Sequence, residues 1–189
     1  MWVARNCGPF CPQIDFLTHC SKCHGTYGDD WTYPSVQVPM DENGTDPVRL
    51  KALTVEGGKK FADSWFAHAG EADAQQTLTD PKGYVAPPLD RIRANEPYLH
   101  NGNVPTLWHL MNSDDRPAVW RPVSSRMDED KVGLTIEQAS QIAVSSNDRV
   151  FGRSYFDTRK FGKSGDGHRF SDALSKSEKQ EVLEYLKTF

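Results

Sequence analysis

Two cysteines and a histidine lie within five residues near the start of the chain, in the order Cys20-Ser21-Lys22-Cys23-His24. Thiols at this spacing can add across both vinyl groups of one haem, and the adjacent histidine is then held under the iron as its axial ligand. The same cysteines could form half of a zinc site or a redox dithiol. No second cluster of zinc ligands follows in the sequence, and the βαβ context of a thioredoxin-like dithiol is missing. The motif therefore predicts one haem c, attached covalently through Cys20 and Cys23 with His24 as proximal ligand.

The composition fits a globular domain that can enclose such a group. The chain has 189 residues, of which 37% are hydrophobic and 25% charged, and its formal net charge is −4. That balance is typical of a folded protein with a core, and the negative charge argues against a nucleic-acid partner. No apolar run approaches the roughly 18–20 residues of a membrane span. We expect one domain over 1–189, with insertions at about 27–54, 70–95 and 112–160.

The first residues contain neither the basic nor the apolar region of a secretory signal. Covalent haem attachment nevertheless needs reduced thiols and an export-side apparatus, so we expect a periplasmic or extracellular bacterial protein whose leader is missing from this numbering. Cys7 and Cys11 have no following histidine and do not form a second haem motif. A short-loop disulfide is the favoured interpretation outside the cytoplasm; a link to another chain, or a remnant of a longer parent protein, is the alternative.

Hydrophobic spacing and turn residues predict the elements that position this chemistry. The clearest is a C-terminal helix, because Ser175 and Glu178 form a capping box and an apolar face follows it. That face consists of Val182, Tyr185, Leu186 and Phe189. The other predicted elements are a helix within 10–24, loop over 27–54, a helix over about 55–69, loop over 70–104, a short helix over 104–111 with Pro105 in its first turn, irregular chain over 112–134, and a helix or strand over 135–145.

Two of these segments resemble class I cytochromes c. Phe16 lies four residues before Cys20, where such cytochromes place a helix-packing aromatic, and residues 182–187 resemble the end of their C-terminal helix. The resemblance implies a mainly α, cytochrome c-like helical fold around one haem, with long irregular loop insertions. It also implies that Phe16 packs against Val182 and Tyr185 where the terminal helices cross, which would contribute a few kcal/mol.

The distal iron ligand of class I cytochromes is usually a methionine upstream of that helix. When Tyr185 is aligned with its counterpart, the methionine position falls on His168, with Gly165 and Phe170 where the loop tends to carry a glycine and an aromatic. The resemblance therefore implies a bis-histidine iron, which has a lower potential than a His/Met iron. The competitors are Met111, the best methionine candidate, and Met40, Met127, His19, His68, His100 and His109.

The segment from Glu96 to Trp108 is similar to a second group of proteins. Its Tyr98-Leu99-His100-Asn101-Gly102-Asn103-Val104-Pro105-Thr106-Leu107 string resembles motifs in di-haem cytochrome c peroxidases and in RoxA-type rubber oxygenases. Those enzymes hold two haems, whereas this chain has a single attachment motif, so it corresponds to their electron-transfer half. The resemblance implies that Tyr98 and His100 line the haem edge or bind a propionate; a turn built on Asn101-Gly102 is the alternative.

Three functions remain open at this stage. A six-coordinate, bis-histidine iron would make the protein a one-electron carrier with an unidentified redox partner protein. An open or displaceable distal site would instead make it a peroxidase- or oxygenase-like enzyme. A third hypothesis is a haem-bearing subunit of a larger electron-transfer assembly or polymer. A low-spin spectrum that carbon monoxide does not change would favour the carrier.

Overall fold

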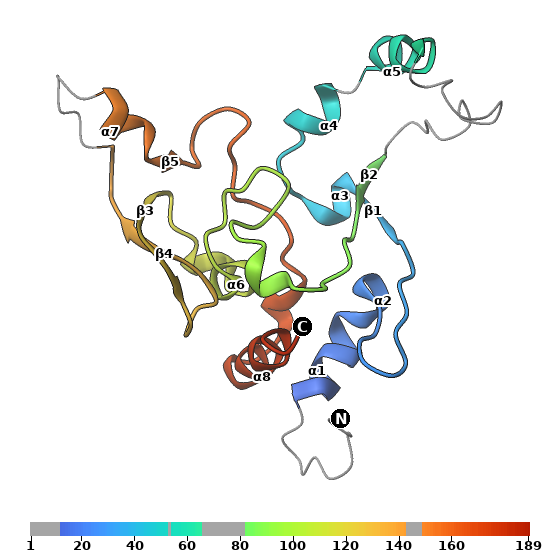
Figure 1. Ribbon diagram of the computed structural model, residues 1–189, viewed down its shortest axis with the longest axis vertical. Coiled ribbons are helices and arrows are strands. Elements are labelled where there is room, and N and C mark those ends of the chain that lie inside the picture. Colours follow the sequence, from blue (N-terminus) through green and yellow to red (C-terminus); the bar gives the residue numbers. More distant parts are fainter. Residues whose placement is uncertain (1–11, 53, 66–81, 143–148) are drawn as a thin grey trace.

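The computed structural model describes residues 12–52, 54–65, 82–142 and 149–189 (Figure 1). Cys7, Cys11 and His68 lie outside these ranges. Helices occupy 38% of the described residues and strands 19%, and the strands form two antiparallel sheets. The prediction of a mainly α fold is therefore wrong.

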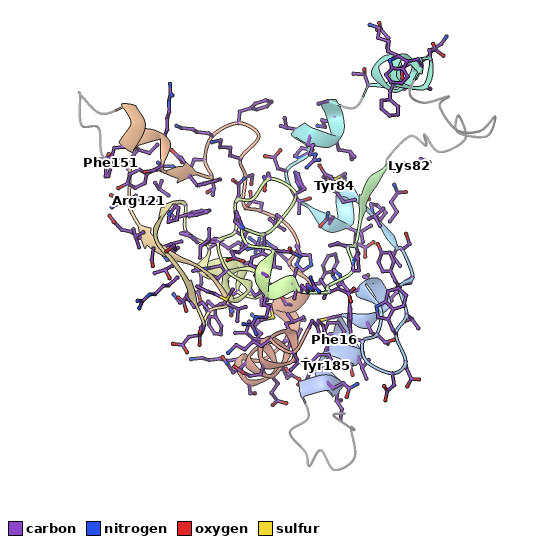
Figure 2. All side chains as sticks on the ribbon, viewed as in Figure 1. Phe16, Lys82, Tyr84, Arg121, Phe151 and Tyr185 are labelled. Carbon is purple, nitrogen blue, oxygen red and sulfur yellow. The ribbon has the colours of Figure 1, made fainter. Side chains whose placement is uncertain are left out.

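The terminal helices nevertheless meet as the resemblance implied. α1 (Pro12–His19) runs into the single turn α2 (Ser21–His24), and α1 packs against α8 (Lys176–Leu186). Phe16 is fully buried there, with its ring centroid 5.2 Å from that of Tyr185, and the two side chains lie together in Figure 2. Val182, at 2% exposure, belongs to the same core cluster. The predicted packing of Phe16 is confirmed.

The C-terminal helix begins as its sequence predicts. Ser175 is the N-cap residue, its hydroxyl accepts a hydrogen bond from the Glu178 amide, and the Glu178 carboxylate accepts one from the Ser175 amide. This reciprocal pair satisfies two amides that the helix itself cannot. The capping box and its helix are confirmed.

A three-stranded sheet occupies the part of the chain that we expected to be irregular. β3 (Val119–Asp128) pairs with β4 (Gly133–Gln138) on one side and with β5 (Phe156–Asp157) on the other. Only the first two residues of β3 are buried, and its middle is exposed. An exposed hairpin has no alternation of apolar and polar residues, so its sequence lacks the signal on which strand prediction depends. The sequence leaves open whether 135–145 forms a helix or a strand, and residues 135–138 belong to strand β4.

Short elements break up the other predicted loops. β1 (Gln37–Pro39) pairs antiparallel with β2 (Gly83–Val85), and α3 (Met40–Asn43) follows β1 directly. Among the described residues, further elements are α4 (Val48–Ala52), α5 (Val55–Ala62), α7 (Arg149–Arg153) and the 3-10 turns η3 (Ile92–Ala94), η4 (Ser113–Asp115) and η5 (Phe170–Ala173). The prediction of continuous loop is therefore wrong over 37–52 and 83–94. In Figure 1, α5 lies at the periphery, away from α8.

α6 (Leu107–Met111) lies at the centre of the molecule, beside α8. Thr106 caps it by accepting a hydrogen bond from the His109 amide, so the helix begins after Pro105. The predicted helix exists, but Pro105 precedes its cap and does not lie in its first turn. Leu107 and Met111 are buried in the same cluster as Phe16. Within the described residues, no helix has the length and hydrophobicity needed to cross a bilayer.

Candidate functional site

The cysteine motif forms one helical turn. The amides of Cys23 and His24 both bond to the Cys20 carbonyl, at 3.1 and 3.0 Å. Residues three and four apart lie on the same face of a helix, so both sulfur atoms and the imidazole project from one side of the turn. Both cysteines are free thiols with partly buried side chains. Burial, with a smaller contribution from Cys23, raises the pKa of the Cys20 thiol to about 11, so this thiol is protonated at neutral pH.

The ring of His24 is oriented by a residue far away in the sequence. Its Nδ1 donates a hydrogen bond to the Pro87 carbonyl oxygen at 2.8 Å. Because Nδ1 carries the proton, the lone pair lies on Nε2, the nitrogen that can bind a metal. Burial lowers the pKa of His24, which favours the neutral imidazole that a ligand must be. Nothing in the sequence marks Pro87 for this role, because a carbonyl acceptor does not depend on the residue type.

His168 has an unusual backbone conformation. Its φ angle is +49° and that of Gly167 is +80°, so two successive residues are left-handed. A non-glycine residue in this region costs about 1–3 kcal/mol, and such residues concentrate at functional sites. The amide of His168 donates to the Asn43 carbonyl oxygen at 2.7 Å. This bond ties the loop to the end of α3.

The side chain of His168 is suited to binding a metal. Its Nδ1 is buried without a hydrogen-bond partner among the described residues. Burial, and to a smaller extent the charges of His24 and Arg116, lowers the pKa of His168 to about 4. The imidazole is therefore neutral at pH 7 with a free lone pair.

The rings of His24 and His168 face one another across a short gap. Their centroids are 6.2 Å apart and the rings are inclined by 55°. The two histidines come from opposite ends of the chain, and neither hydrogen-bonds to the other ring. The structure thus places His168 next to His24, the predicted proximal ligand.

The other predicted site residues have different surroundings. Tyr98 is 4% exposed, and its hydroxyl donates to the backbone oxygens of Ile92 and Val132 at 3.2 and 3.4 Å. His100 stacks on Tyr84, with ring centroids 4.3 Å apart. Among the contacts of the described residues, neither side chain meets His24 or His168, and their role at a haem edge stays a prediction.

The competing ligands also lie elsewhere. His109 is 1% exposed and shares a 2.7 Å hydrogen bond with the Thr106 hydroxyl, which gives it a structural role. Met111 is packed in the core, and the exposed His19 ends α1. Met40 begins α3 and Met127 pairs with Leu134 in the sheet.

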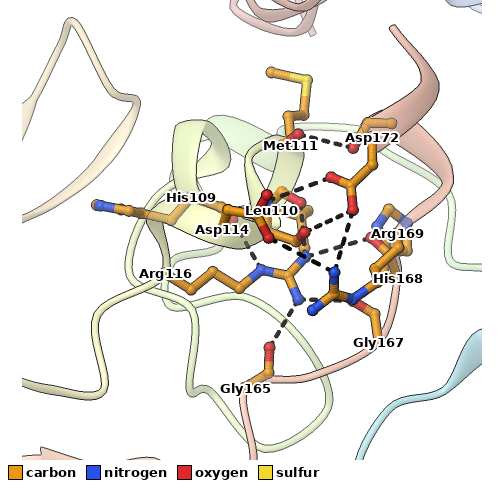
Figure 3. A network of polar contacts seen from close by, with 12 residues as sticks. His109, Leu110, Met111, Asp114, Arg116, Gly165, Gly167, His168, Arg169 and Asp172 are labelled. Carbon is orange, nitrogen blue, oxygen red and sulfur yellow. Dashed lines mark hydrogen bonds and ion pairs between the residues drawn. The ribbon is translucent and has the colours of Figure 1, made fainter.

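A half-buried arginine that no sequence motif marks connects α6 to the loop of His168. Arg116 donates hydrogen bonds to five backbone carbonyl oxygens, and Figure 3 shows it at the centre of this network. These acceptors belong to His109, Leu110, Gly165, Gly167 and His168. No sequence signal could have found this role, because all five acceptors are backbone atoms.

Comparisons with known proteins agree with the resemblance drawn from the sequence. Residues 83–121 match the family described as RoxA-like, cytochrome c-like. The chain is 34% identical, over 92% of its length, to the uncharacterized protein y4iM of Sinorhizobium fredii (strain NBRC 101917 / NGR234), and 36% identical, over 78% of its length, to the uncharacterized protein y4iJ of the same strain. It covers 46% of the first relative and 22% of the second, so it spans less than half the length of either.

The matched segment runs from β2 through α6 and Arg116 to the first residues of β3. The segment therefore includes both Pro87, which orients His24, and Arg116, which bonds to the loop of His168. The resemblance to RoxA-type cytochrome c-like domains is confirmed over residues 83–121, and this match suggests a haem-binding function.

Proposed function

We propose that this protein is a mono-haem c-type cytochrome that transfers one electron at a time. Cys20 and Cys23 hold the haem covalently, and His24 and His168 are the two axial ligands of its iron. When bound, haem c supplies one-electron Fe(III)/Fe(II) chemistry. The protein works outside the cytoplasm, in the periplasm or beyond it, with a redox partner protein.

The separation of the two imidazole rings is the observation that carries this proposal. A metal–imidazole bond is about 2.0 Å long and a ring nitrogen lies about 1.2 Å from the ring centre, so two imidazoles on opposite sides of one metal have centroids about 6.4 Å apart. The centroids of His24 and His168 are 6.2 Å apart. The inclination of 55° is compatible with this arrangement, because each ring can rotate about its own metal–nitrogen bond.

The residues of the chain supply the remaining requirements. Pro87 fixes the tautomer of His24, and the low pKa of His168 keeps its lone pair free at neutral pH. The free thiols of Cys20 and Cys23 leave both sulfur atoms available for thioether bonds. With haem bound, His24 and His168 would both be strong imidazole donors to the iron, which would favour electron transfer over substrate binding and lower the potential relative to a His/Met site.

The test compares wild type with His168→Ala, and uses His100→Ala as a matched histidine control. The wild type is expected to give a low-spin bis-imidazole EPR spectrum and, when reduced, to leave carbon monoxide unbound. His168→Ala should become high-spin and bind carbon monoxide, whereas His100→Ala should behave as wild type because His100 stacks on Tyr84.

Three outcomes would contradict the proposal. An unchanged spectrum of His168→Ala would exclude His168 as a ligand. A thioether-to-iron charge-transfer band in the wild type would assign the position to a methionine, with Met111 as the first candidate. Binding of carbon monoxide by the wild type would favour a haem enzyme with a displaceable distal site. Mass spectrometry of the intact chain tests the cofactor separately, since a covalent adduct equal to one haem is expected and should be lost when both Cys20 and Cys23 are replaced by serine.

A further inference from the structure

The hydrogen bonds of Arg116 use all the donors that an arginine has. Nε donates to the His109 oxygen at 3.0 Å, and one terminal nitrogen donates to the Leu110 oxygen at 2.9 Å and to the His168 oxygen at 3.3 Å. The other terminal nitrogen donates to the Gly165 and Gly167 oxygens, both at 2.7 Å. A guanidinium carries five N–H groups in a rigid plane, and each has one carbonyl here.

These acceptors lie on two segments that are distant in the sequence. His109 and Leu110 are in the last turn of α6, where a helix leaves its carbonyls without intrahelical partners. The other three carbonyls belong to residues 165–168, which we call the distal loop. Arg116 therefore joins the end of α6, itself packed in the core, to the loop that carries His168 (Figure 3).

The distal loop needs such a restraint. His168 has a left-handed conformation that is unfavourable for a histidine, and relaxation of that backbone would rotate its imidazole away from His24. Besides Arg116, side-chain bonds hold the neighbouring Ser164, whose amide donates to Asp46 and whose carbonyl accepts from Asn101 and Asn103. Within the part of the chain that the structure describes, the bonds to the carbonyls of the loop itself come from Arg116, and the His168 amide donates to the Asn43 carbonyl.

We propose that Arg116 is a positioning residue that holds the distal loop closed, so that His168 stays opposite His24. The proposal rests on the function proposed above, because it assumes that His168 is an axial ligand. It assigns the effect to the planar, five-donor geometry of the guanidinium and not to its charge alone. A lysine at this position would keep the charge, but its three N–H donors radiate from one atom and cannot reach five carbonyls on two segments.

The experiment separates geometry from charge with two variants of the holoprotein. Arg116→Gln removes the charge and the five-donor geometry, whereas Arg116→Lys removes the geometry and keeps the charge. Arg126→Gln is the control, since it removes one positive charge from an exposed position on β3. Carbon monoxide binding to the reduced protein reports whether His168 leaves the iron, and hydrogen exchange of the 165–168 amides reports loop opening in the same samples.

Both Arg116 variants should bind carbon monoxide when reduced, which the wild type is expected not to do, because several charge-assisted hydrogen bonds to the loop are lost. Exchange in the distal loop should rise while exchange in α8 stays as in wild type, which separates loop opening from global unfolding. Arg126→Gln should match wild type in both measurements. If Arg116→Gln does not retain haem, the comparison of Arg116→Lys with wild type decides whether the guanidinium geometry holds the loop.

Two results would overturn the inference. Carbon monoxide binding and loop exchange at wild-type levels in Arg116→Gln would show that the arginine does not hold the loop. Wild-type behaviour of Arg116→Lys beside a reactive Arg116→Gln would show that charge suffices and that the fork geometry is irrelevant. Failure of the proposed function is distinguishable from both, because the wild type itself would then bind carbon monoxide or lack the bis-imidazole signal.

Discussion

Gly167 is the position at which the geometry of the distal loop can be tested most sharply. A Cβ atom there would lie in hard contact with the Thr45 nitrogen and the Gly44 carbonyl carbon, and 2.6 Å from the Asn43 oxygen. All three are backbone atoms, which cannot move aside by a change of rotamer. The φ angle of +80° adds a second penalty for any residue with a Cβ.

We therefore expect Gly167→Ala to lower the free energy of unfolding by about 2–3 kcal/mol. The left-handed conformation costs an alanine about 1–2 kcal/mol, and loss of the bond from the His168 amide to Asn43 costs about 1 kcal/mol more. Displacement of the loop from α3 should also loosen His168. The reduced variant should consequently bind carbon monoxide, which the wild type is expected not to do.

The assay is urea unfolding of the haem-loaded protein followed by far-UV circular dichroism, with the slope of the transition compared between variants. Gly165→Ala is the matched control two residues away, because its Cβ would meet only the Thr158 side chain, at 3.7 Å, and its φ angle is not left-handed. Gly165→Ala should stay within about 0.5 kcal/mol of wild type or be slightly more stable. Equal stability and equal carbon monoxide binding in the two variants would refute the reasoning.

Two further predictions concern the core. Phe16→Ala should lower the unfolding free energy by about 3–5 kcal/mol in urea titrations, because it removes a fully buried ring that packs on Tyr185. The control is Leu17→Ala, at a 39% exposed position, which should lower it far less. Similar losses in the two variants would contradict the contact between Phe16 and Tyr185. Burial lowers the pKa of His109 to about 4, whereas a histidine in an unfolded chain has a pKa of about 6.5. The neutral His109 therefore stabilises the fold above pH 6.5, and this contribution is lost as the pH falls towards 4. Over this window the unfolding free energy of wild type should fall more steeply than that of His109→Gln, by up to about 1.4 kcal/mol per pH unit. Parallel curves would show that folding does not lower the pKa of His109.

Local patterns account for the parts of the structure that were predicted correctly. The capping box of Ser175 and Glu178 concerns residues one turn apart, and the amphipathic face that follows it is read from the same few residues. The aromatic before the cysteine motif was placed through its family resemblance, and Phe16 does pack on α8. The β3–β4 hairpin was missed because its strands are mostly exposed, so backbone pairing and not hydrophobic alternation holds it.

The sequence by itself determined the chemistry that the proximal side can offer: two thiols and an imidazole on one helical turn, together with the helix that packs behind them. Only the tertiary structure decided which histidine lies 6.2 Å from the ring of His24, and which residues hold it there. The physical reason is that Pro87, Asn43 and the partners of Arg116 act through backbone carbonyl oxygens. Every residue type has such an oxygen, so its use depends on the path of the chain and leaves no trace in the order of side chains.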